Sequence, residues 1–162
     1  MRLVLLLVLV GCGGASSEIS GSAGGVDFED TRFVYFGGPY VVISTIEVEC
    51  LDLAWVARNY EEGVAPTDLD TALVQFAFAD NPDADLDMLE GRHAVAPDAG
   101  VTSTVVSVVN GAATFTTATA GLFTVDTLDE EDLAEGVLEA VTFEDGGSVS
   151  GSYTAEWCRN LR

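Results

Sequence analysis

Residues 137–157 read VLEAVTFEDGGSVSGSYTAEW, two segments of alternating apolar and polar character around the sequence DGG. In the second segment, 148–157, apolar or small residues alternate with Ser, Thr and Glu. A period of two places each set on one face of a strand, and a Gly-rich tripeptide is typical of a hairpin turn. We therefore predict an antiparallel hairpin with one buried face and one face in water.

Similar segments recur along the chain. They are rich in β-branched and aromatic residues and are separated by Gly, Pro and Asn turns, and Asn110-Gly111 is a strong hairpin signal between two of them. The further strands expected are 32–36, 40–48, 71–79, 89–95, 101–109, 112–119 and 122–128. Many short strands at near-regular spacing predict an all-β fold, an antiparallel β-sandwich or barrel.

One segment has a different period. From Leu53 to Tyr60 the apolar residues fall three and four apart, as one face of a helix requires, and Pro66 follows. We predict one short helix of two to three turns after Cys50.

The N-terminus decides the compartment. Arg2, an apolar run over 3–10 and a small residue before Cys12 are the three parts of a secretory signal. The run is too short to cross a bilayer as a helix. Residues 9–12, LVGC, resemble the lipobox of bacterial lipoproteins, in which the signal is cut before the cysteine and that cysteine carries acyl chains such as palmitate.

By that resemblance, residues 1–11 are a signal peptide and Cys12 is the lipidation site. Residues 12–18 are a flexible tether, and 19–162 form a single β-domain. Gly13, rather than Asp, after the cysteine implies the outer membrane. The alternative is an ordinary signal peptide cut nearby, which leaves Cys12 as a thiol.

Two more cysteines, Cys50 and Cys158, form an even pair in a chain sent to an oxidising compartment. We predict a disulfide between them. Closing a loop of that length stabilises the folded chain by about 4 to 5 kcal/mol in the chain-entropy model. Two isolated cysteines without a nearby histidine are a poor metal site.

The charge balance restricts the partners. The chain has 27 acidic and 6 basic residues, all of the latter Arg, for a net charge of −21. Such a surface repels phosphate backbones and anionic headgroups, so we expect no nucleic-acid binding, and membrane contact only through the lipid anchor. Charged partners should be cations or basic proteins. We favour a second explanation, in which the acids serve solubility or a salty habitat.

One loop is dense in candidate metal ligands. Alternating carboxylates can converge on Ca²⁺, which takes six to eight oxygen ligands. The spacing begins like an EF-hand loop, but Met88 occupies the position of the turn glycine. The candidate ligands are Asp80, Asp83, Asp85, Asp87 and Glu90. We favour a solvated loop, with Ca²⁺ as the alternative and no other cofactor.

The sequence contains no recognisable catalytic motif. His93 is the single histidine, and there is no Gly-x-Ser-x-Gly elbow and no Gly-Lys phosphate loop. The absence of Lys excludes Schiff-base chemistry. We predict that the protein is not an enzyme.

Several Gly-rich motifs carry a family resemblance. They are GGV at 24–26, AGLFTV at 120–125, and GGSVSGSY at 146–153 running to AEWC at 155–158. These resemble a group of small, uncharacterised Gram-negative bacterial lipoproteins in which a closing Gly-Ser-aromatic-x-Ala strand ends in a cysteine. The resemblance implies the fold, the anchor and the disulfide, but no site.

The leading hypothesis is therefore a lipid-anchored, non-enzymatic cell-envelope domain with a structural or interaction role. The alternative is a surface lipoprotein that binds Ca²⁺ or a small ligand. A barrel with a wide apolar mouth would favour a ligand inside it, and a filled core would argue against one.

Overall fold

The computed structural model describes residues 17–29, 31–51, 53, 71–78, 90–109, 112–129 and 132–161. Within these ranges the chain is all-β, as predicted, and its ten strands belong to one sheet. The strands are β1 (Glu18–Ala23), β2 (Val26–Asp27), β3 (Phe33–Gly37), β4 (Tyr40–Ser44), β5 (Thr71–Phe78), β6 (Gly91–Ala94), β7 (Val101–Val109), β8 (Ala112–Asp129), β9 (Leu133–Phe143) and β10 (Ser148–Trp157).

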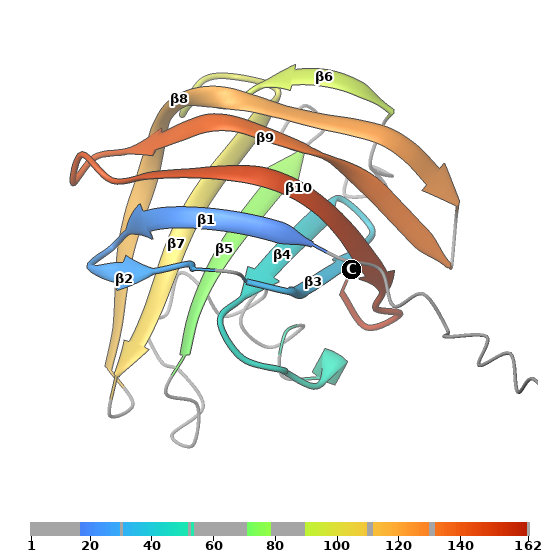
Figure 1. Cartoon of the computed structure of the whole chain (residues 1–162), viewed down its shortest axis with the longest axis horizontal. Coiled ribbons are helices and arrows are strands. Elements are labelled where there is room, and N and C mark those ends of the chain that lie inside the picture. Colours follow the sequence, from blue (N-terminus) through green and yellow to red (C-terminus); the bar gives the residue numbers. More distant parts are fainter. Residues whose placement is uncertain are drawn as a thin grey trace, which may run out of the picture.

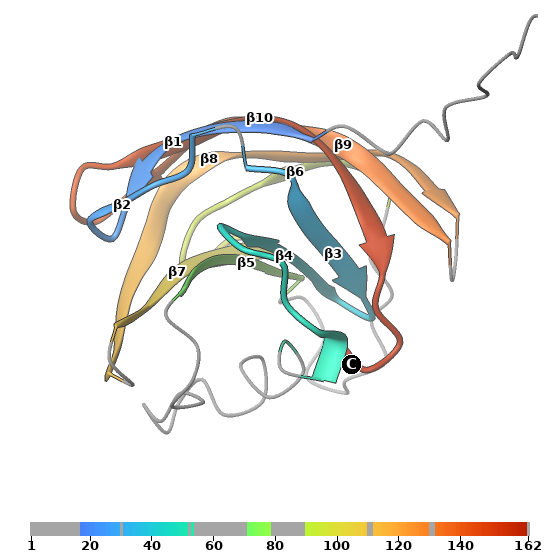
Figure 2. The ribbon, with the colours of Figure 1, turned by 60° about the horizontal axis from the view of Figure 1, so that its bottom comes forward.

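Seven of these strands close into a barrel, which decides between the two predicted architectures (Figure 1). The ring runs β3-β4-β5-β7-β8-β9-β10, and β10 returns to β3. Strands β1 and β6 lie outside the ring and pair with β10 and β8 respectively. In Figure 2 the curved layer of β1, β8, β9 and β10 lies over the layer of β3, β4, β5 and β7.

The hairpin predicted over 137–157 is confirmed as β9 and β10. Val149, Tyr153 and Ala155 are buried at 0 to 2% exposure, while the serines at 150 and 152 are exposed, as the alternation requires. Gly146, with a φ of 83°, lies in the turn between the strands, where the left-handed backbone favours glycine.

The barrel closes through a short parallel pairing, which we call the barrel seam. Glu156 lies opposite Tyr35 and Trp157 opposite Phe36, and the Cys158 N–H donates to the Phe36 carbonyl at 2.7 Å. The other pairings of the ring contain five or more residue pairs each, whereas the seam contains two. Closure therefore depends on additional contacts at this point.

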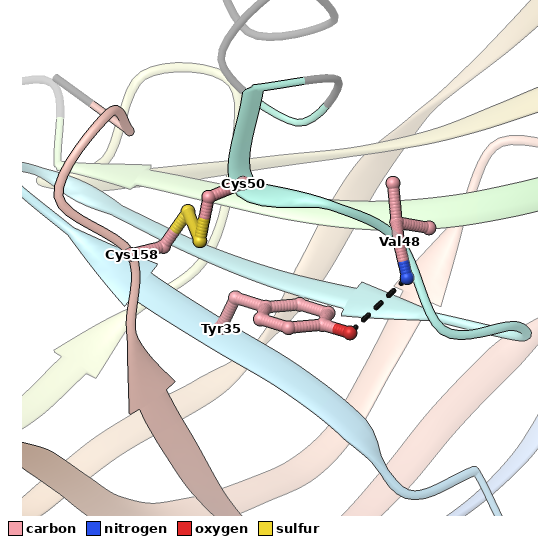
Figure 3. Close-up of a disulfide and its surroundings, with 4 residues drawn as sticks. All are labelled: Tyr35, Val48, Cys50 and Cys158. Carbon is pink, nitrogen blue, oxygen red and sulfur yellow. Dashed lines mark hydrogen bonds between the residues drawn. A yellow bond between two sulfur atoms is a disulfide. The ribbon is translucent and has the colours of Figure 1, made fainter.

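The disulfide predicted between Cys50 and Cys158 supplies one of these contacts. The two Cα atoms lie 5.5 Å apart, and the cysteines are separated by 108 positions in the sequence. The bond joins the segment after β4 to the end of β10, directly beside the seam (Figure 3).

An aromatic stack lies in the interior of the barrel. The ring centroids of Phe76 and Phe123 lie 4.8 Å apart, and those of Phe123 and Tyr153 lie 5.4 Å apart, both stacked. Phe78 meets Phe123 edge-on at 5.9 Å. The buried Tyr153 hydroxyl donates to the Thr124 carbonyl at 3.0 Å, so the one polar atom of the stack is satisfied.

A second apolar cluster, which we call the outer cluster, covers the outside of the β3-β4-β7 face. On β4, Val41 and Ile43 belong to the interior and Val42 to the outer cluster, as a period of two requires. The buried members of the outer cluster are Tyr35, Val42, Val48, Leu53, Val106, Val108, Cys158 and Leu161. The segment after β4 and the C-terminal residues 158–161 thus pack onto the outside of the barrel.

The short helix predicted after Cys50 is not supported. The Leu53 N–H donates to the Glu49 carbonyl at 3.2 Å, which gives a single helical turn, and residues 54–70 lie outside the described part. Leu53 is 1% exposed because it packs into the outer cluster. Its burial does not require a multi-turn helix, and short helices gain little stability from propensity alone. Among the residues described, no helix has the length and apolar character needed to cross a membrane.

Two predicted strand boundaries differ by more than two residues from those observed. The strand expected over 40–48 ends at Ser44, where the pairing with β3 stops because Phe33, opposite Ser44, is the first residue of β3. Residues 45–49 leave the sheet, although β5 continues to Thr71 on the other side. The strands expected over 112–119 and 122–128 are one strand, β8. Gly121, with a φ of 145°, and the neighbouring register shifts bend this strand without breaking it.

Replacement of both disulfide cysteines, Cys50→Ala with Cys158→Ala, should lower the free energy of unfolding by about 3 to 5 kcal/mol. The reason is that the unfolded chain regains the entropy of a long open loop. Urea denaturation followed by circular dichroism measures the change, and Cys12→Ala is the matched control that leaves the barrel contacts intact. A loss below about 1 kcal/mol would contradict the role given to this bond.

Candidate functional site

A pocket of about 470 Å³ lies on the outside of the barrel beside the seam. We call it the β3 pocket. Three separate segments line it: the start of β3, the segment after β4 and the end of β10. The lining residues are Arg32, Phe33, Val34, Tyr35, Glu47, Val48, Glu49, Thr154 and Glu156.

The pocket lies where two strands share one edge of β10. Strand β1 pairs with residues 148–152 of β10, and β3 pairs with Glu156 and Trp157. Between them, the Ser17 hydroxyl accepts a hydrogen bond from the Thr154 N–H at 3.0 Å and donates one to the Thr154 carbonyl at 3.1 Å. A side chain thus substitutes for a strand at this point, and β1 and β3 diverge around it.

The segment 45–49 forms the opposite wall. The Val48 N–H donates to the Tyr35 hydroxyl at 3.2 Å (Figure 3). The Ile46 N–H donates to Ser44 Oγ at 3.3 Å. Cys50 follows at once and is fixed by the disulfide. The bond to Tyr35 and the disulfide hold the segment against the barrel, although it pairs with no strand.

The pocket combines apolar walls with a negative rim. Tyr35 and Val48 are 8% and 7% exposed, whereas the large apolar side chain of Phe33 remains 37% exposed. The rim carries three exposed glutamates and one exposed arginine. Burial raises the pKa of Tyr35, the hydrogen bond from Val48 opposes this, and the charges of Glu47 and Glu156 raise the pKa further. Two carboxylates on opposite walls of the pocket therefore raise the pKa of the same Tyr35 hydroxyl.

Most of the site residues expected from the sequence are not tested. Cys12 and the candidate Ca²⁺ ligands Asp80, Asp83, Asp85 and Asp87 lie outside the described residues. Glu90 is described, and its Oε1 accepts a hydrogen bond from the Leu128 N–H at 3.1 Å. No group of three or more His, Cys, Asp or Glu able to hold a metal ion is found within the described ranges. The Ca²⁺ site stays a prediction.

His93 lies on β6, half-buried, and its ring meets Phe78 edge-on with centroids 4.9 Å apart. Its neighbour Arg92 forms an exposed ion pair with Glu139 at 2.8 Å. The imidazole thus packs against Phe78 of the core.

Sequence reasoning missed the β3 pocket. Ile46, Glu47 and Val48 alternate as a strand does, and the sequence prediction therefore extended β4 through them. A usable signal was present in the predicted disulfide. Glu49 lies one position before Cys50, and Glu156 lies two positions before Cys158. The bond between the cysteines therefore brings these carboxylates to one side of the barrel.

A comparison with known protein families, curated proteins and solved structures finds no match. The function is therefore inferred from the barrel and the β3 pocket.

Ser17→Ala should lower the free energy of unfolding by about 1 to 2 kcal/mol, because both backbone groups of Thr154 lose their partner. Ser20→Ala, at an exposed position of β1 three residues later, is the matched control and should change it by less than about 0.5 kcal/mol. Equal effects of the two substitutions in urea denaturation would contradict the bridging role of Ser17.

Tyr35→Phe removes the acceptor of the buried Val48 N–H and should cost about 1 to 2 kcal/mol. The same substitution should speed the hydrogen exchange of the Val48 amide, because the segment 45–49 loses a contact with β3. Exchange measured by NMR checks this, with Tyr40→Phe as the control. An unchanged Val48 amide would show that the hydroxyl does not hold this wall.

Proposed function

We propose that the protein is a lipid-anchored, non-enzymatic domain of the cell envelope that binds a partner at the β3 pocket. In this proposal, residues 1–11 are removed, Cys12 carries the acyl chains, and the domain is held at the outer membrane. The supporting features are the start of β1, the aromatic stack inside the barrel and the concave site on its outside.

The start of β1 is the observation that carries the proposal. The strand begins at Glu18, six residues after Cys12, and Ser17 is 3% exposed and hydrogen-bonded to β10. Six extended residues span about 20 Å. A chain anchored at Cys12 therefore holds the barrel close to the membrane surface, and its tether leaves the barrel beside Thr154, which lines the pocket.

A binding role on the outside of the barrel is favoured over a ligand inside it. The stack of Phe76, Phe123 and Tyr153 occupies the interior between β5, β8 and β10. Outside, the β3 pocket has the volume typical of a small-ligand or side-chain site, and its lining combines aromatic side chains with charged ones.

A non-enzymatic role agrees with the chemistry of this pocket. The Tyr35 hydroxyl is largely buried, and the main effect on its pKa is an increase from burial. A phenol held in its neutral form is a weak nucleophile and a weak base.

The anchor is tested by expressing the full chain in a Gram-negative host and measuring the mass of its N-terminal peptide. The mature chain should begin at Cys12 and carry acyl mass, and the protein should partition into the detergent phase. Cys12→Ser should keep residues 1–11 and carry no acyl mass. The control, Cys50→Ala with Cys158→Ala, should still be acylated. A mature chain without acyl mass on Cys12 would overturn the anchor.

A further inference from the structure

We infer that the β3 pocket binds an arginine side chain presented by a basic partner protein. This inference rests on the proposed binding function and names the chemistry of the partner. It follows from the walls of the pocket, the placement of its carboxylates and the charge of the whole chain.

The walls suit the flat, weakly hydrated face of a guanidinium group. Phe33 lines the pocket and is 37% exposed, and Tyr35 contributes a second ring on the same face of β3, two residues away. Arginine stacks on aromatic rings more readily than lysine does, because its charge is delocalised over a plane.

The carboxylates stand on two opposite walls. Glu47 and Glu49 belong to the segment after β4, and Glu156 belongs to β10. The nine lining residues are all described, and their carboxylates do not form a group that could hold a metal ion. A guanidinium group is wider than a metal ion and has five donors in a fixed fork, so it can bridge carboxylates that are set apart.

The net charge of the chain supports a basic partner. At −21, the long-range field attracts basic proteins and repels anionic surfaces. The net charge attracts a basic peptide to the whole surface of the protein. An experiment must therefore distinguish this attraction from binding in the β3 pocket.

The test uses the full chain in a non-ionic detergent at about 150 mM salt, where general attraction is screened beyond about 8 Å. The probe is a fluorescent tri-arginine peptide blocked at both ends, and its binding is followed by anisotropy. Tri-citrulline, a neutral peptide of the same shape, should not bind, and tri-lysine should bind several-fold more weakly. Phe33→Ala should weaken tri-arginine binding several-fold through the lost stacking.

The decisive comparison uses two triple variants that remove the same charge. Glu47→Gln with Glu49→Gln and Glu156→Gln should weaken tri-arginine binding by about 10-fold or more. The control changes three exposed acidic residues that do not line the pocket, Glu29→Gln, Asp98→Asn and Glu144→Gln, and should weaken it by less than about 2-fold. Thermal melts confirm that both variants fold.

Three results would overturn the inference: equal weakening by the two triple variants, citrulline binding as tight as arginine binding, or no arginine binding at millimolar peptide. None of these results bears on the acylation of Cys12, which is read from the N-terminal peptide. Conversely, if the chain binds arginine but its N-terminal peptide carries no acyl mass, the proposed lipid anchor is overturned and the arginine site is not. The two proposals therefore fail separately.

Discussion

The parallel pairing of β10 with β3, held by the Cys50–Cys158 bond, is the constraint on which the structure depends. It contains two residue pairs, yet it joins the last strand of the chain to the third. All other neighbours in the ring are antiparallel, and several are consecutive hairpins that form from local sequence. The aromatic stack needs the layers to face each other, because Phe76 comes from β5 and Tyr153 from β10. Closure at the seam fixes that arrangement.

The same constraint produces the candidate site. Strand β10 reaches β3 only at its end, and β1 occupies its beginning, so the two strands diverge beside Thr154. The disulfide then holds the segment 45–49 against the opposite side of the gap. The β3 pocket is thus a consequence of how the barrel closes, and its lining residues come from distant parts of the sequence. Its charge and its aromatic wall connect the fold to the proposed recognition of a basic partner.

Features that depend on neighbouring residues could be predicted from the sequence, and, apart from the disulfide, features that depend on residues far apart in the sequence could not. The β9–β10 hairpin was predictable because alternation and a Gly-rich turn are local signals, and the disulfide because two cysteines remain beyond the signal segment. The end of β4 was not predictable, since residues 46–48 alternate as a strand does yet leave the sheet after Ser44. Nor was the continuity of β8, which Gly121 bends without ending the ladder. The parallel seam left no local pattern. The β3 pocket depends on that seam, so it could not be derived from periodicity or motifs.

The most direct test of this account is the hydrogen exchange of the Cys158 amide, which donates to the Phe36 carbonyl across the seam. With the disulfide intact, this amide should exchange as slowly as those of the β8–β9 ladder. After selective reduction it should exchange much faster while that ladder keeps its protection, because the seam opens before the rest of the barrel. Fast exchange with the disulfide intact, or unchanged protection after reduction, would contradict the central role of the stapled seam.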